Sequence, residues 1–127
     1  MSAFQVCFVL ASDSPQNLAS FYASALDAPI QAGFNKDHWV IQHPEGVRIQ
    51  VFRPSSTTSF KRGGRSFSLC LIKPKSNDPL KDLNKVIQTL QMIGAKVVEE
   101  GRLDEFGAES WLSDPEGNEF LILVPKN

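Results

Sequence analysis

Residues 111–125 read WLSDPEGNEFLILVP, in which a tight turn leads directly into an apolar segment. Pro115 fixes one backbone dihedral angle of the turn, and Gly117 supplies a backbone conformation that other residues resist. The apolar residues 120–124 show no helical spacing and are followed by Pro125, so they are predicted to form a buried strand. This turn and strand form the unit around which the rest of the chain is organised.

An earlier segment repeats this pattern. Residues 43–54 read HPEGVRIQVFRP, with the same Pro-Glu-Gly turn, the same kind of strand and a closing proline. The two turns lie 71 residues apart, counted from Pro44 to Pro115. The strand predicted at residues 67–72 also matches residues 4–9 position for position. This second match places Cys70 in the same position as Cys7.

Each of these matched strands is followed by a predicted helix. The first helix begins at Ser14-Pro15 and the second at Asp78-Pro79, each with a capping side chain and a proline at the first helical position. Pro29 ends the first helix and Gly94 the second. Apolar residues at helical spacing give each helix one face to lie on a sheet. These residues are Leu18, Phe21, Tyr22 and Leu26 in the first helix, and Leu83, Val86, Ile87, Leu90 and Ile93 in the second.

After the first helix, two short extended strands are predicted at residues 30–34 and 38–42, before the strand that follows the first Pro-Glu-Gly turn. The order strand, helix, strand, strand, strand therefore occurs twice, which predicts a duplicated β-α-β-β-β unit. We expect one α+β domain over residues 1–127, made of module 1–54, linker 55–64 and module 65–127. Two such modules can join their sheets into a curved eight-stranded surface with the helices outside. A central cleft between them would be a natural site for a small molecule.

Composition narrows the class of protein. The chain has 127 residues, of which 42% are hydrophobic and 21% charged, as is typical of one soluble globular domain. A net charge of −1 gives no reason to expect nucleic acid or an acidic membrane as a partner. The basic run at residues 61–65 is predicted to be a solvated linker, with a nucleic-acid contact as the alternative. Two cysteines without a signal peptide or a membrane-spanning run favour the cytoplasm.

The duplicated plan resembles the vicinal oxygen chelate superfamily, which includes glyoxalase I, bleomycin-resistance proteins and extradiol dioxygenases. Three motifs carry the resemblance: Phe21-Tyr22 before the helix-ending Pro29, Ile93-Gly94-Ala95, and above all Asp114-Pro115-Glu116-Gly117-Asn118 before the final strand. The resemblance covers nearly the whole chain. It implies the fold but no single chemistry, because members of the superfamily carry out unrelated functions.

In the metal-dependent members, His and Glu side chains from the first and last strands of each module bind a divalent ion that holds substrate oxygens. The resemblance places these positions at Cys7, Gln50, Leu121 and, in the second module, at Cys70 or alternatively Ser66 or Ser68. Leucine cannot ligate, glutamine is a weak neutral donor, and two thiols fall short of the ligands that zinc requires. The resemblance therefore implies a protein without the usual metal site, and we expect no cofactor.

The expected cleft face follows from the alternation of side chains along the strands. Arg48, Gln50 and Phe52 share one strand face, and the in-out pattern of the superfamily adds Gln5 and Cys7 to it. Arg48 could hold a carboxylate or phosphate group of a ligand, or lie at the rim in water or paired with Glu119. The predicted ligand-binding set is Gln5, Cys7, Trp39, Arg48, Gln50, Phe52, Ser68, Cys70, Glu119 and Leu121.

Several of these residues also have a structural interpretation. Cys7 and Cys70 could form a thiol-reactive pair, but two small buried cleft residues are the simpler interpretation. Trp39 could stack on a flat ligand, although packing is the more common role of a large aromatic residue. The only histidines, His38 and His43, lack ligand spacing and are expected to be exposed near turns.

These observations predict a protein of the superfamily that lacks the usual metal and binds an organic small molecule, as bleomycin-resistance-like members do. The resemblance also implies a homodimer. One alternative is an enzyme of the lyase, isomerase or dioxygenase kind, with a displaced metal site or with metal-free chemistry at Cys7 or Glu119. Another alternative is an interaction module that acts through its surface. The residues do not identify a catalytic group.

Overall fold

The computed structural model describes residues 6–56 and 67–127. The chain forms two compact units, which we call unit 1 (Met1–Lys61) and unit 2 (Arg62–Asn127). Gln5, Ser66 and the basic run 61–65 lie outside the described residues. In the described part of the chain no helix is long and apolar enough to cross a membrane.

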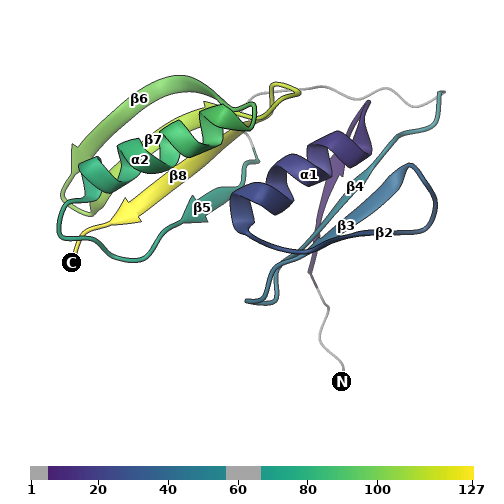
Figure 1. Ribbon diagram of the computed structural model, residues 1–127, viewed down its shortest axis with the longest axis horizontal. Helices are drawn as coiled ribbons and strands as arrows, with labels where there is room; N and C mark the ends of the chain where they lie inside the picture. The colour runs from purple at the N-terminus through teal and green to yellow at the C-terminus, as the bar shows by residue number, and fades with distance from the viewer. Residues whose placement is uncertain (1–5, 57–66) are drawn as a thin grey trace. The chain divides into compact units, whose positions relative to one another are not determined.

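Unit 1 follows the predicted order strand, helix, strand, strand, strand (Figure 1). Its elements are β1 (Phe8–Ala11), α1 (Pro15–Leu26), β2 (Ile30–Ala32), β3 (His38–Gln42) and β4 (Arg48–Phe52). The strands form one sheet in the order β1-β4-β3-β2, in which β1 runs parallel to β4 and the other pairs are antiparallel. The strand predicted at residues 38–42 is confirmed, whereas the first strand begins only at Phe8.

Helix α1 begins and ends where the sequence predicts, but the predicted cap is wrong, because the Ser14 side chain accepts no hydrogen bond from the backbone N–H groups of the first turn. Pro15 occupies the first turn, and Asp27 ends the helix in the left-handed conformation with φ 50°. The predicted apolar face is buried at Leu18, Phe21 and Tyr22. The helix lies against β3 and β4, so these side chains form the core of unit 1 with the sheet.

Unit 2 repeats the same topology, with longer elements except for its first strand (Figure 1). It contains β5 (Cys70–Ile72), α2 (Pro79–Met92), β6 (Lys96–Asp104), β7 (Gly107–Ser113) and β8 (Glu119–Pro125), with the sheet order β5-β8-β7-β6. The α+β class and the duplicated β-α-β-β-β unit are therefore confirmed. The single domain over residues 1–127 and the cleft shared by the two modules stay predictions.

The turn between β7 and β8 is held together by a buried carboxylate. Asp114 is 2% exposed. One of its oxygens accepts hydrogen bonds from the backbone N–H groups of Glu116 and Asn118, at 2.8 and 3.0 Å. The other oxygen accepts a bond from the Asn118 side-chain amide at 2.9 Å. Gly117 takes the positive φ of 88° that the turn needs, which explains the order of residues in the motif.

The turn of unit 1 uses a histidine for the same purpose. His43 occupies the place of Asp114, and its Nδ1 accepts one hydrogen bond from the backbone N–H of Glu45 at 3.1 Å. Gly46 has a φ of 100°. A neutral imidazole therefore supplies one acceptor where the aspartate supplies several.

The strand register corrects one sequence prediction. In unit 1, Val9 pairs with Gln50, whereas in unit 2 Cys70 pairs with Leu121. Gln50 and Leu121 occupy equivalent positions after their turns, because they follow Pro44 and Pro115 by the same number of residues. Cys70 is therefore the counterpart of Val9.

The position-for-position match of Cys70 with Cys7 is thus wrong by two residues, and Ser68 is the counterpart of Cys7. Side chains alternate across a strand with a period of two. A shift of two residues keeps every apolar residue on the same face, so the sequence pattern fits both alignments equally well. The alternative that placed the superfamily position at Ser68 agrees with the observed register.

Candidate ligand-binding pocket

One face of the unit 1 sheet is covered by a helix and the other is not. Ile49 and Val51 on β4 are 1% and 0% exposed and point to the same side as Ile41 on β3. This is the side against which α1 packs. Gln50 and Phe52 alternate with them and therefore point to the opposite side. We call that side the open face of unit 1.

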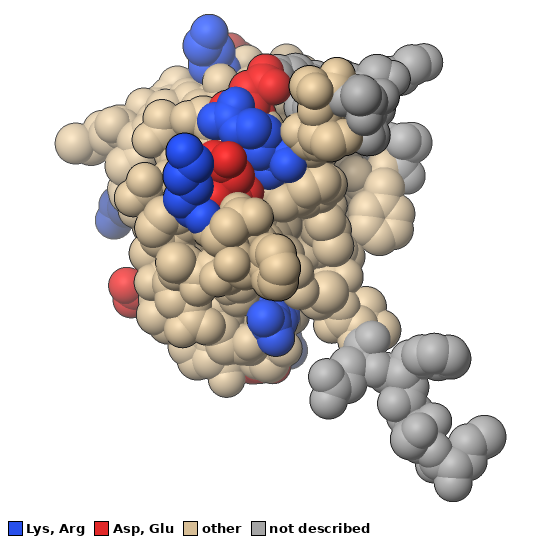
Figure 2. All heavy atoms as spheres, turned by 90° about the vertical axis from the view of Figure 1, so that its right-hand side faces the viewer, with Lys and Arg blue, Asp and Glu red and all other residues tan. Residues whose placement is uncertain are grey.

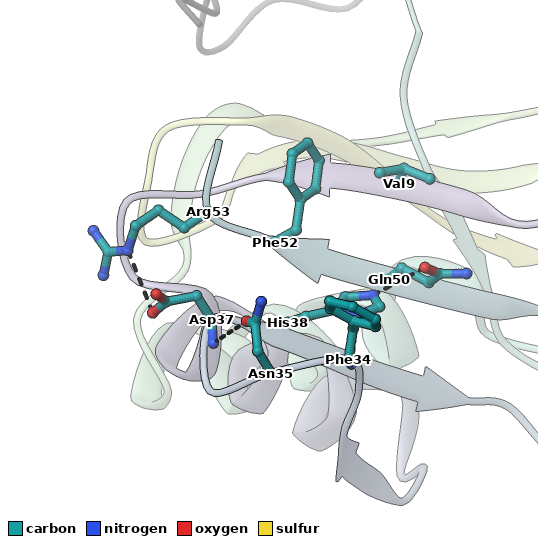
Figure 3. A pocket seen from close by; sticks show the side chains of 8 residues that line it. All are labelled: Val9, Phe34, Asn35, Asp37, His38, Gln50, Phe52 and Arg53. Atoms are coloured by element: carbon teal, nitrogen blue, oxygen red, sulfur yellow. Dashed lines mark hydrogen bonds and ion pairs between the residues drawn. The ribbon is translucent and has the colours of Figure 1, made fainter. Parts of the chain in front are cut away.

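A pocket of about 430 Å³ lies on this open face. Its walls come from β1, the β2–β3 loop, β3 and the end of β4 (Figure 3). The residues that line it are Val9, Phe34, Asn35, Asp37, His38, Gln50, Phe52 and Arg53. A volume of this size falls in the range of small-molecule sites, about 300–1,000 Å³.

A chain of hydrogen bonds crosses the floor of the pocket. The backbone N–H of Phe34 donates to His38 Nδ1 at 2.8 Å, and His38 Nε2 lies 2.9 Å from Gln50 Oε1. A backbone N–H can only donate, so Nδ1 must be the acceptor and the ring proton must sit on Nε2. Gln50 Nε2 in turn donates to Cys7 Sγ at 3.5 Å. The arrangement fixes a neutral imidazole in one tautomer and orients the Gln50 amide.

The histidine can take this position because a glycine leaves room for it. A Cβ on Gly33 would lie 2.5 Å from His38 Nδ1, closer than two such atoms can approach. The backbone N–H of Gly33 also donates to the carbonyl oxygen of His38 at 2.7 Å. The loop from Gly33 to His38 is therefore closed around the imidazole.

An ion pair forms one end of the pocket. Arg53 Nε lies 3.4 Å from Asp37 Oδ1, and the backbone N–H of Arg53 donates to the carbonyl oxygen of Asp37 at 3.0 Å. The backbone N–H of Asp37 donates to Asn35 Oδ1 at 2.8 Å. Figure 3 shows this pair at the end of the pocket away from Val9 and Gln50. The loop and the end of β4 are thus tied together at the rim.

The structure brings some of the predicted site residues of unit 1 together and separates others. Gln50 and Phe52 line the pocket, and Cys7 adjoins it through its bond to Gln50. Arg48 is exposed on the same strand face but does not line the pocket. Trp39 pairs with Val51 and so points to the side of α1, where its indole N–H donates to the carbonyl oxygen of Lys36.

Sequence reasoning placed His38 at the start of a strand, but it expected the side chain to be exposed and gave it no part in the site. The histidine pairs with Phe52 in the β3–β4 register and is half-buried on the open face. The alternation of His38, Val40 and Gln42 along the strand shows that these three side chains share one face. Only the pairing of β3 with β4 shows that this face also carries Gln50 and Phe52.

In unit 2 the corresponding strand face carries Ser68, Cys70, Glu119 and Leu121. Cys7 and Cys70 are both exposed, so the interpretation of the two cysteines as small buried residues is wrong. Partial burial of the Cys70 thiol still raises its pKa, and the negative charge of Glu109 raises it further. The Glu109 carboxylate accepts a hydrogen bond from Arg102 of the neighbouring strand. The hydroxyl oxygen of Ser68 is buried and has no hydrogen-bond partner among the residues that the structure describes. Ligand binding by these residues stays a prediction.

The positions that the superfamily uses for its metal hold an unsuitable set of donors. They fall at Cys7, Gln50, Ser68 and Leu121 once the observed register is applied. Leucine has no donor atom, and a hydroxyl and a carboxamide are weak ligands. Across residues 6–56 and 67–127, no three His, Cys, Asp or Glu side chains are grouped so that they could hold a metal ion. These residues do not fit the metal of the superfamily.

The sequence profile of the Glyoxalase-like domain matches residues 6–123, nearly the whole chain. The chain belongs to this family. The glyoxalase-like domain is part of the vicinal oxygen chelate superfamily, so the resemblance stated above is confirmed. No curated protein gave a significant match to the sequence.

Solved structures share the fold of this glyoxalase-like domain. A hypothetical protein from S. aureus is 18% identical, with a TM-score of 0.77 over 98% of this chain and 95% of that one. A glyoxalase/bleomycin resistance protein from Albidiferax ferrireducens T118 is 16% identical, with a TM-score of 0.67 over 92% and 94%. The fosfomycin resistance protein FosX from Listeria monocytogenes is 11% identical, with a TM-score of 0.72 over 98% and 94%. At these identities the likeness shows a common fold only.

Proposed function

We propose that this glyoxalase-like domain binds an organic small molecule in the pocket on the open face of unit 1, without the metal of the superfamily. One observation carries the proposal. A pocket of about 430 Å³ has an ordered polar floor, His38 and Gln50, beside the apolar side chains of Phe34 and Phe52. Apolar walls with a few fixed polar groups are what small-molecule sites share.

The proposal needs no metal, because the polar floor is already held in place by hydrogen bonds within unit 1. The unsuitable donors at the superfamily positions support the same view. In this form the domain resembles the binding members of the superfamily more than its metalloenzymes.

The test is a ligand screen with a paired substitution. A panel of organic metabolites is screened by NMR, following the side-chain amide signals of Asn35, which lines the pocket and is retained in every variant. The change Gln50→Leu introduces the residue that unit 2 carries at the equivalent position 121, so the sheet should tolerate it. The variant should lose about one hydrogen bond to the ligand, roughly a tenfold weaker Kd at most.

The matched control is Gln31→Leu, which changes an exposed glutamine of β2 that does not line the pocket. It should leave the Kd of any ligand unchanged. If both variants weaken binding equally, or if no compound perturbs the pocket signals, the proposed site is wrong.

We further propose that the protein acts in the cytoplasm as a homodimer and does not bind nucleic acid. Two free cysteines fit a reducing compartment, and the dimer follows from the resemblance to the superfamily. Figure 2 displays one face of the molecule, on which acidic and basic side chains are interspersed rather than gathered by sign. Light scattering on the purified protein tests the dimer, and retention on immobilised DNA and RNA tests the last point.

A further inference from the structure

The aromatic walls of the pocket in unit 1 are unusually accessible. Phe34 is 89% exposed although it lines the pocket, and Phe52 on β4 is half-buried. The backbone of Phe34 is held by its hydrogen bond to His38, so the position from which its ring extends is fixed. Figure 3 shows the Phe34 ring beside the His38 imidazole. Phenyl faces that are already in place favour a flat ring as their partner.

The two amide side chains of the pocket leave N–H donors for a ligand, because each of their oxygens already accepts one hydrogen bond. Gln50 Oε1 accepts from His38, and Asn35 Oδ1 accepts from the backbone of Asp37. Both ring nitrogens of His38 are used within unit 1. The side-chain amino group of Asn35 and the second N–H of Gln50 have no partner among the described residues. A carboxamide group without a partner for its N–H calls for an acceptor oxygen.

Arg53 adds a charged donor at the rim. Only its Nε approaches Asp37, so the terminal amino groups of the guanidinium have no partner within the described part of the chain. The side chain is 49% exposed. A guanidinium presents its N–H groups as a planar fork that matches the two oxygens of a carboxylate. Asp37 holds one edge of this group and leaves another edge open.

A positively charged ligand is disfavoured by the same arrangement. Among the described residues, Asp37 is the only carboxylate that lines the pocket, and its Oδ1 already faces Arg53. The imidazole of His38 is neutral in the tautomer that its two bonds require. An ammonium group would therefore compete with Arg53 for one carboxylate.

We infer that the pocket selects planar aromatic carboxylates, with the ring against Phe34 and Phe52 and the carboxylate on Arg53. The inference rests on the proposed function, because it names the class of ligand for the same site. Ring oxygens or carbonyl groups of the ligand would take the N–H groups of Asn35 and Gln50.

Four simple probes separate the contributions in an NMR titration that follows the side-chain amide signals of Asn35 and Gln50. Benzoate carries both required features, cyclohexanecarboxylate lacks the aromatic ring, benzylamine reverses the charge and benzamide is neutral. Benzoate should bind about tenfold more tightly than cyclohexanecarboxylate and benzylamine. Benzamide should bind more weakly than benzoate.

Substitution of Arg53 gives a second test of the class of ligand. Arg53→Gln should weaken benzoate binding about fivefold or more and leave benzamide binding unchanged, since only the carboxylate uses the guanidinium. The matched control is Arg48→Gln, which removes an exposed arginine from the same strand outside the pocket. Both variants remove a surface charge, so both should fold.

The outcomes distinguish the two proposals. If none of the four probes but a compound of the metabolite panel perturbs the pocket signals, the proposed function stands and the class of ligand is wrong. If neither the probes nor the panel perturb them, both fail. If benzylamine or cyclohexanecarboxylate binds as tightly as benzoate, the pocket stands and the class of ligand is wrong. The same holds if Arg48→Gln weakens benzoate as much as Arg53→Gln does.

Discussion

The carboxylate of Asp114 offers a direct test of why the chain needs its Asp-Pro-Glu-Gly-Asn turn. Replacement by alanine removes the acceptor of two backbone N–H groups and of the Asn118 side-chain amide. Leaving a donor without a partner in a buried place costs about 1–3 kcal/mol, and bonds to a charged group lie at the upper end. Water can reach Glu116 and Asn118 in part, because both residues are half-buried. We therefore expect Asp114→Ala to lower the free energy of unfolding by about 3 kcal/mol.

The matched variant is His43→Ala at the equivalent turn of unit 1. There the side chain accepts one hydrogen bond from an exposed backbone N–H at 3.1 Å, so its loss should cost about 1 kcal/mol or less. Urea unfolding followed by circular dichroism measures both changes. With a slope of about 1–3 kcal/mol per molar urea, the midpoint of Asp114→Ala should fall by roughly 1–3 M.

The comparison of the two variants tests whether the buried Asp114 carboxylate stabilises the turn. If Asp114→Ala costs no more than His43→Ala, water replaces the carboxylate without loss. The buried aspartate would then not be the reason for the motif. A result in which Asp114→Asn retains most of the stability would show that the acceptor oxygen matters more than the charge.

Three further changes test the sites described above. Because burial and Glu109 raise the pKa of Cys70, less of its thiol is ionised at a given pH. Its alkylation by iodoacetamide, followed by mass spectrometry, should be slower in the folded than in the unfolded protein and should increase at higher pH; equal rates would contradict the raised pKa. Gly33→Ala should displace the imidazole of His38 and break its bond to the Phe34 N–H. Nitrogen NMR should show the Nε2–H tautomer of the neutral ring in the wild type and a changed ring environment in the variant; an unchanged spectrum would refute the close approach. Treatment with a chelator should leave the Kd of any pocket ligand unchanged, and a loss of binding would show that a metal takes part.

The sequence was sufficient for the architecture because the signals that set it are local. The cap and proline at Ser14-Pro15 and at Asp78-Pro79, together with the helical spacing behind them, predicted both helices. The strand at residues 38–42 followed from the turns on either side of it. Repetition of these signals at similar offsets predicted the duplication and so the superfamily.

Which residues come together in the pocket depends on how the strands pair, and no local sequence signal determines that pairing. The face to which Gln50 and Phe52 point could be read from alternation along one strand. The residues that pair with Gln50 and Phe52 on neighbouring strands could not be predicted in this way. A strand shifted by two residues presents the same side chains to each face. That ambiguity misplaced Cys70 against Cys7.

The sequence alone therefore determined the elements, their order and the faces of single strands, since each depends on neighbours along the chain. The tertiary structure alone decided that His38 pairs with Phe52 and reaches Gln50, and that Trp39 lies on the side of α1. Register brings together side chains from separate strands, and it follows from the combined hydrogen bonds and packing of the whole sheet. The pocket of unit 1 is a product of that register.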